Sequence, residues 1–212
     1  MKKFDGIIFD IDGTLASTNN LIMASFNHVA EIYLGKRFTW EEIHSLFGPT
    51  ENVILLDMMK ENYEKARMDY YNFYSEQHDA MADIYPGMKE IIEKLKLEGV
   101  LLSIYTGKGR ESSEITLKKL GVYEHFDMIV TGDDIEGQKP SPDGVDMFIN
   151  KYGLNRDRVI MIGDAPADIK AARNSGIKVA SVVWDSYAKE KVLSMQSDYV
   201  FHAVEELAEF LT

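Results

Sequence analysis

The sequence contains no cysteine among its 212 residues. Disulfide bonds and thiol chemistry are therefore excluded, and the chain must be stabilised by its own hydrophobic core. Its length suffices for one full core and a smaller appended domain, and its 45% hydrophobic content is ordinary for a soluble protein. The five histidines are scattered without the spacing of metal ligands, so we expect no zinc site.

Positive charge is also scarce. Lysine and arginine together number 23 against 35 acidic residues, which gives a formal net charge of -12 at pH 7. Such a surface repels a phosphate backbone, and no basic stripe along the chain offsets it. We therefore expect no nucleic-acid partner.

Long hydrophobic runs are missing as well. No apolar stretch reaches the length of a membrane span, so we expect no membrane partner. The chain enters an apolar stretch at residue 6, which leaves no room for a signal peptide before it. A cytoplasmic location is the resulting expectation.

Short apolar runs are what the chain does contain. They predict strands at residues 6–10, 101–106, 128–131, 159–163 and 178–183. Amphipathic helical patterns between these runs are typical of the crossovers of a parallel sheet. The expected fold class is therefore α/β, with a Rossmann-like parallel sheet as its core.

One long segment interrupts this alternation. Residues 18–83 contain no convincing strand and are rich in helix formers and aromatic residues, and Thr39 and Glu42 within them match a capping box. We therefore predict an all-helical cap domain at residues 18–83, inserted into a core domain of residues 1–17 and 84–212. Large side chains at helical spacing should fill the interior of this cap: Tyr63, Met68, Tyr70, Tyr71, Phe73 and Tyr74.

Two acids follow the first apolar run. Alternate residues at the end of a strand point to one side, so Asp10 and Asp12 can converge on one ligand, and Gly13 permits a sharp turn after them. Carboxylates at the carboxyl end of a parallel strand suit a magnesium ion and a phosphoryl group. Taken alone, such a pair is more often an acidic turn, so the assignment depends on what accompanies it.

Three further segments accompany the two acids, each at the end of a predicted strand or just before a predicted helix. They are Thr106-Gly107-Lys108, Lys139-Pro140, and Gly163-Asp164 followed by Asp168. The order D-x-D-G-T, T-G-K, K-P and G-D-x-x-x-D spans essentially the whole chain and resembles the haloacid dehalogenase (HAD) superfamily of aspartate-nucleophile phosphohydrolases. Residues 47–50, 106–110 and 163–168 look most similar to its phosphoglycolate phosphatase and pyrophosphatase branch.

The acids can be given roles from this resemblance and from the chemistry of a phosphate ester. An ester is protected by its own negative charge, so a carboxylate nucleophile needs a cation, here Mg²⁺, that neutralises both groups. We expect Asp10 to be the nucleophile and a metal ligand, and Asp12 to act as general acid and then as general base. The resemblance implies that the backbone carbonyl of Asp12 also contacts the metal. Asp164 would be a direct ligand, and Asp168 would order the metal-bound waters.

The phosphoryl oxygens need donors on the side away from the metal. Thr106 offers a hydroxyl, Gly107 leaves the backbone free to approach an anion, and Lys139 supplies a fixed positive charge. Lys108 and Arg110 either bind substrate or are solvated residues near a helix start, and the sequence favours neither interpretation.

The expected function is therefore magnesium-dependent hydrolysis of a small anionic metabolite, a phosphoglycolate-like phosphomonoester. The cap would close over the site, and its loop at residues 48–51 would select the substrate. An inorganic pyrophosphatase of the same fold is the alternative. Asp133 and Asp134 are expected to form only a turn.

Other functions fit the residues less well. A dehalogenase has no phosphate leaving group to protonate, so Asp12 argues against it. A sugar phosphomutase would be expected to carry a histidine near Ile22, where this chain has none. The non-enzyme alternatives are a receiver-like module, which would lack the cap, and an inactive regulatory phosphate-binding protein. Nothing in the sequence specifies an oligomeric state.

Overall fold

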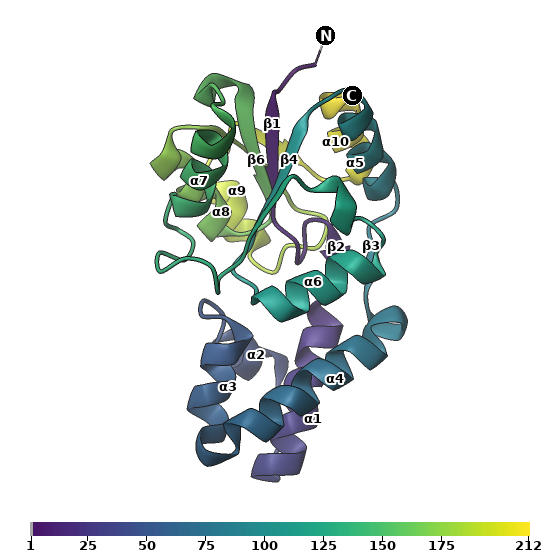
Figure 1. The fold of residues 1–212 in the computed structure, drawn as a ribbon, viewed down its shortest axis with the longest axis vertical. Coiled ribbons are helices and arrows are strands. Elements are labelled where there is room, and N and C mark those ends of the chain that lie inside the picture. The colour runs from purple at the N-terminus through teal and green to yellow at the C-terminus, as the bar shows by residue number, and fades with distance from the viewer. Residues whose placement is uncertain (1) are drawn as a thin grey trace.

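The core of the molecule is a six-stranded parallel sheet in the order β5-β4-β1-β6-β7-β8 (Figure 1). The computed structural model describes residues 2–212, so Met1, which the sequence assigns to the core domain, lies outside the described residues. All five predicted strands are present, and a sixth short strand, β8, joins the edge of the sheet. The strands are β1 Gly6–Phe9, β4 Leu101–Tyr105, β5 Met128–Val130, β6 Val159–Gly163, β7 Lys178–Val182 and β8 Tyr199–Phe201.

Alternating side chains of β1 show why the sheet carries helices on both faces. Ile7 and Phe9 belong to the apolar cluster formed with helices α5 and α10, whereas Ile8 packs with helices α7 and α8 on the other face. A strand buried on both sides reads as a continuous apolar run, which is the pattern of a parallel sheet. The α/β class predicted from the sequence is therefore confirmed. The core helices are α5 Met88–Leu97, α6 Arg110–Lys119, α7 Asp143–Tyr152, α8 Pro166–Ser175, α9 Lys189–Ser194 and α10 Val204–Leu211.

The inserted segment forms a separate layer of helices below the sheet in Figure 1. Its own apolar cluster includes Phe26, Ile54 and Tyr70, which are almost fully buried. The predicted capping box is present, since Thr39 Oγ1 accepts a hydrogen bond from the Glu42 backbone at 3.3 Å and the Glu42 carboxylate accepts one from the Thr39 backbone at 2.8 Å. The cap elements are α1 Asn19–Leu34, α2 Trp40–His44, α3 Glu51–Met59, the 3₁₀ helix η1 Lys60–Asn62 and α4 Tyr63–Met81.

Not every large side chain of α4 lies inside the cap. Tyr70, Tyr71 and Tyr74 are buried as predicted, but Met68 is 61% exposed, so its placement in the interior was wrong. Met68 lies on the opposite side of the helix from Tyr70, because two residues correspond to about 200° of rotation.

Two short strands connect the cap to the core. β2 (Ala16–Ser17) and β3 (Asp83–Ile84) pair antiparallel where the chain leaves the core and where it returns. We propose these crossings as the domain boundaries, with the cap at residues 18–83 and the core at residues 1–17 and 84–212. Among residues 2–212, no helix has both the length and the apolar character needed to cross a bilayer.

The central strands should contribute most to the stability of the core. Ile160 of β6 is fully buried, so we expect Ile160→Ala to lower the free energy of unfolding by about 2–5 kcal/mol through the lost burial and the cavity left behind. Urea unfolding of the two proteins measures the difference. Leu97→Ala, at a residue that is 89% exposed, is the matched control and should change the stability by less than about 0.5 kcal/mol. Equal effects of the two substitutions would contradict this assignment of the core.

Candidate active site

The four sequence motifs meet at the carboxyl ends of β5, β4, β1 and β6, which are neighbours in the sheet. Parallel neighbours end on the same side, so the acids after β1, the loop after β4 and the acids after β6 are brought together there. They surround a cavity of about 260 Å³ that the cap covers. The core residues that line it include Asp10, Asp12, Thr106, Gly107, Lys108, Lys139 and Asp164.

Lys139 is the positive centre of this site. Its Nζ lies 2.8 Å from Asp10 Oδ1 and 2.5 Å from Asp168 Oδ1, and all three side chains are buried. Burial by itself would lower the pKa of Lys139, but the carboxylates of Asp10 and Asp168 raise it above its ordinary value. The lysine therefore stays charged. Asp168 is also held by the backbone N–H of Ala165, which donates to Asp168 Oδ2 at 2.9 Å at the start of α8.

The negative charge at this site exceeds what Lys139 can neutralise. Asp10, Asp164 and Asp168 each offer an oxygen, and these oxygens all lie within 4.8 Å of one another. Burial raises the pKa of Asp10 to about 6, and Lys139 opposes the shift while Asp168 and Asp12 add to it. Burial, together with Asp10 and Asp168, also raises the pKa of Asp164 well above its usual range. Three buried carboxylates sharing one ammonium group are a donor set that fits a hard divalent cation such as Mg²⁺.

Gly13 allows Asp164 to approach this closely. Its backbone has a φ of +75°, and a Cβ added there would lie 2.6 Å from Asp164 Oδ2. Any other residue would therefore have both a strained backbone and a collision with the carboxylate.

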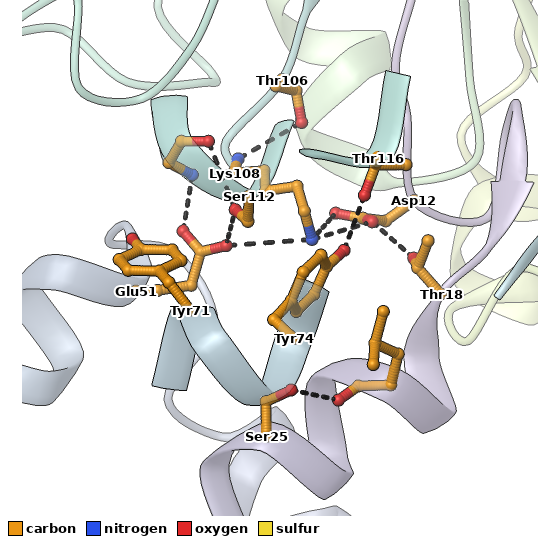
Figure 2. Close-up of polar contacts among 12 residues, drawn as sticks. Asp12, Thr18, Ser25, Glu51, Tyr71, Tyr74, Thr106, Lys108, Ser112 and Thr116 are labelled. Carbon is orange, nitrogen blue, oxygen red and sulfur yellow. Dashed lines mark hydrogen bonds and ion pairs between the residues drawn. The ribbon is translucent and has the colours of Figure 1, made fainter. Parts of the chain in front are cut away.

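The side chain of Asp12 lies apart from that group of three carboxylates. Lys108 Nζ is 3.2 Å from Asp12 Oδ1 and 3.3 Å from Asp12 Oδ2, and the hydroxyl of Thr18 donates a hydrogen bond to Oδ1 (Figure 2). The sequence predicts Asp10, Asp164 and the backbone carbonyl of Asp12 as metal ligands, with Asp168 ordering the metal-bound waters. In the structure the Asp168 carboxylate lies beside those of Asp10 and Asp164, and the Asp12 side chain pairs with Lys108, so the division between direct ligands and water-ordering residues stays a prediction.

The loop after β4 places Thr106 and Lys108 differently from Arg110. Thr106 is buried, and its Oγ1 accepts a hydrogen bond from the Lys108 backbone at 3.2 Å. The side chain of Lys108 is 1% exposed and faces the cavity, so the solvated alternative does not describe it. Arg110 is not among the cavity-lining residues, and its guanidinium group pairs with Asp134 and donates to the Ile129 carbonyl at 3.0 Å.

The predicted Asp133–Asp134 turn has a supporting role at the start of α6. Asp133 Oδ2 accepts a hydrogen bond from the Arg110 backbone at 2.9 Å and one from Asn52 Nδ2 of the cap at 3.3 Å. Asp134 accepts from the backbone and hydroxyl of Thr131, at 2.7 and 2.6 Å. Neither acid lines the cavity.

The cap loop reaches the core through Glu51. Gly48, Pro49 and Glu51 line the cavity, as the prediction for residues 48–51 requires. The Glu51 carboxylate accepts hydrogen bonds from the Gly109 backbone at 2.6 Å and from the Ser112 hydroxyl, and Oε1 lies 3.8 Å from Lys108 Nζ (Figure 2). The sequence did not predict this contact, because Glu51 and Gly109 are 58 positions apart. It also did not predict the role of Thr18, because no local pattern links Thr18 to Asp12.

Comparison with known proteins agrees with this geometry. Residues 7–182 match the family model described as haloacid dehalogenase-like hydrolase. Pyrophosphatase PpaX of Halalkalibacterium halodurans is 33% identical over 211 residues, which cover 99% of this chain and 97% of that protein. Pyrophosphatase PpaX of Bacillus velezensis is 32% identical over 206 residues, with 97% and 95% covered. The chain therefore belongs to the haloacid dehalogenase-like hydrolase family, as the sequence resemblance predicted.

Solved structures share the fold. A crystal structure described as a predicted phosphoglycolate phosphatase from Haemophilus somnus has a TM-score of 0.88 at 21% identity and covers 100% of both chains. CbbY from Rhodobacter sphaeroides, in complex with phosphate, has a TM-score of 0.81 at 21% identity and covers 96% of both chains. At these identities the likeness concerns the fold, including the inserted helical cap.

The buried carboxylates predict a pH-dependent stability in the absence of metal. The pKa of Asp10 is raised from 3.8 to about 6, so its contribution is fully present below about pH 4 and is lost as the pH rises through about 6. In chelator, Asp10→Asn should therefore gain stability relative to wild type between about pH 4 and pH 7, by on the order of 3 kcal/mol. Thermal unfolding across this range measures it. Mg²⁺ should stabilise wild type at neutral pH.

The control for this experiment is Asp57→Asn, a substitution of an exposed cap acid. It should leave the difference from wild type constant across the same pH range. If the stability difference between Asp10→Asn and wild type did not change with pH, the folded protein would not raise the pKa of Asp10.

Proposed function

We propose that this protein is a magnesium-dependent phosphoric monoester hydrolase that acts on a small phosphorylated metabolite through an aspartyl-phosphate intermediate. The observation that carries the proposal is the placement of Asp10 at the end of β1, beside the Lys139 ammonium and two further buried carboxylates, inside a cavity that the cap covers. A carboxylate held next to fixed positive charge in a cavity between core and cap is suited to attack phosphorus.

In the first half of the proposed reaction, a carboxylate oxygen of Asp10 forms a bond to phosphorus while the bond from phosphorus to the leaving oxygen breaks. Asp12 lies two residues further along and lines the same cavity, so it is placed to give a proton to that oxygen. Thr18 and Lys108 hold the Asp12 side chain in position.

In the second half, water attacks the phosphorus of the aspartyl phosphate, and the bond to Asp10 breaks to release inorganic phosphate. Asp12 accepts the proton from the water, which returns the acid to the state that the next substrate needs.

The phosphoryl oxygens are bound by groups of the core. The Thr106 hydroxyl, the backbone at Gly107 and the Lys139 ammonium would donate to them. Asp10, Asp164 and the backbone carbonyl of Asp12 would hold Mg²⁺, with Asp168 orienting its waters. When bound, the ion neutralises the phosphoryl oxygens and the attacking carboxylate.

Pyrophosphate hydrolysis is the second candidate, and the observation in its favour is the name of the relatives at 32% and 33% identity. The same core chemistry would serve both reactions, because a phosphoryl group is transferred to Asp10 in each. The two differ only in the leaving group, which is an alcohol for a monoester and phosphate for pyrophosphate.

Substitution of the two acids should separate their roles. Asp10→Asn should lower kcat by a factor on the order of 10⁴ or more, because the nucleophile is lost. Asp12→Asn should be comparably slow on an alkyl phosphate but much less impaired in the first step with p-nitrophenyl phosphate, whose leaving oxygen needs no proton. Rapid-quench measurement of phosphoenzyme distinguishes the steps. Near wild-type turnover by Asp10→Asn would contradict the covalent mechanism, and Asp57→Asn is the unaffected control.

Chelation should abolish turnover, and added Mg²⁺ should restore it. Asp164→Asn should raise the Mg²⁺ concentration needed for half-maximal rate by about tenfold or more, because one carboxylate ligand is lost. The measurement is the initial rate as a function of free Mg²⁺. Full activity in excess chelator would rule out the proposed metal dependence.

A further inference from the structure

The cavity has two chemically different ends. At the core end lie the charged groups that would bind the phosphoryl group. At the cap end, where the leaving group would lie, the wall is mainly apolar. The residues of this wall are Ile22, Phe26, Phe47, Pro49, Ile54 and, from the core, Tyr187, with Asn19 beside them. A leaving group must therefore contact a mostly hydrocarbon surface, which favours apolar atoms over charged ones.

Lys108 is the one lysine or arginine at the cap end among the cavity-lining residues, and its charge is already used. Its Nζ lies 3.2 Å from Asp12 and 3.8 Å from Glu51, and its side chain is 1% exposed. Burial alone would lower the pKa of Lys108, but Asp12 and Glu51 help to raise it. Lys108 is already paired with the side chains of Asp12 and Glu51, so no ammonium group at this end of the cavity is free to compensate a second anion.

Glu51 is fixed where it stands. Its carboxylate accepts hydrogen bonds from the Gly109 backbone and from Ser112, which are the N-cap residue and a first-turn residue of α6. A helix N-terminus favours a carboxylate. The approach is so close that a Cβ on Gly109 would lie 2.6 Å from Glu51 Oε2. Since these contacts join the cap to the core, Glu51 cannot turn away from a substrate without breaking them.

We infer that the substrate is a phosphomonoester of a small alcohol that carries no negative charge, and that Glu51 is the residue that rejects a second anion. This inference rests on the proposed function. It separates this chain from an enzyme for phosphoglycolate or pyrophosphate, whose leaving groups are anions. The cavity of about 260 Å³ lies below the range of about 300–1,000 Å³ that is usual for drug-sized ligands, so the alcohol has only a few heavy atoms.

A matched pair of esters tests the inference. Phosphoglycolate and its neutral amide have the same number of heavy atoms and differ in one charge. With Mg²⁺, wild type should hydrolyse the amide with a kcat/KM on the order of tenfold or more above that of phosphoglycolate, because the carboxylate of the latter meets Glu51. Ethyl phosphate and pyrophosphate extend the comparison, and ethyl phosphate should be preferred by a similar factor.

Glu51→Gln then tests whether Glu51 causes the preference for the neutral ester. Glutamine is isosteric, and it can accept from the Gly109 backbone and donate to the Ser112 hydroxyl, so the cap contact is retained while the charge is removed. The ratio of amide to phosphoglycolate should fall by about tenfold, mainly through faster hydrolysis of phosphoglycolate. Glu61→Gln, at an exposed cap acid, is the control and should leave the ratio unchanged. Thermal unfolding verifies that both variants are folded. The ratio measured for wild type tests the inference by itself, even if a variant does not fold.

The outcomes are distinct. If wild type prefers phosphoglycolate to the neutral esters, the inference is overturned and the proposed function survives. If wild type prefers pyrophosphate, the inference is overturned and the second candidate function replaces the first. If the neutral preference is present but Glu51→Gln does not change it, the assignment to Glu51 is overturned. If wild type with Mg²⁺ hydrolyses none of the esters, p-nitrophenyl phosphate included, the proposed function fails and the inference fails with it.

Discussion

The ammonium group of Lys139 makes this site possible, because it holds Asp10 and Asp168 together in a buried position. Without that charge the carboxylates of Asp10, Asp164 and Asp168 would repel one another, and burial would favour their neutral forms. With it, an excess of negative charge remains that suits a divalent cation. The Lys139 ammonium group is thus the fixed cation that keeps Asp10 and Asp168 in place. Asp10 gains its position from the same ion pair.

Strand order brings these groups together. Because β1 pairs with β4 on one side and with β6 on the other, three loops from distant parts of the sequence end within reach of one phosphoryl group. Residues of the cap complete the lining of the cavity opposite the sheet. Glu51 and Asn52 of α3 contact the start of α6 and Asp133, so the helix that follows the cavity-lining loop after β4 also contacts the cap. A change at that contact would alter both the leaving-group end of the cavity and the position of Lys108.

The division of labour follows from the two halves of the chain. The core contributes most of the hydrogen-bond donors and charges that line the cavity, whereas the cap contributes a mainly apolar wall and the Glu51 carboxylate. Similarity to the two pyrophosphatases therefore supports the chemistry of the core more directly than it supports a particular substrate. Under the proposed function, residues at the cap end would select the leaving group, because a buried charge without a partner is costly.

The sequence by itself determined the α/β class, five of the six strands, the helical insertion and the members of the four motifs, since these depend on local periodicity and spacing. The sequence analysis missed the edge strand β8, because a run of three residues is too short to show a strand pattern. It also misplaced Met68, because helical spacing alone did not show which side of α4 is buried. Only the tertiary structure decided that the Asp168 carboxylate lies beside those of Asp10 and Asp164, that Lys108 pairs with Asp12, and that Glu51 contacts the start of α6. Lys108 and Asp12 are 96 positions apart and Glu51 and Gly109 are 58 positions apart, and no local pattern encodes such contacts.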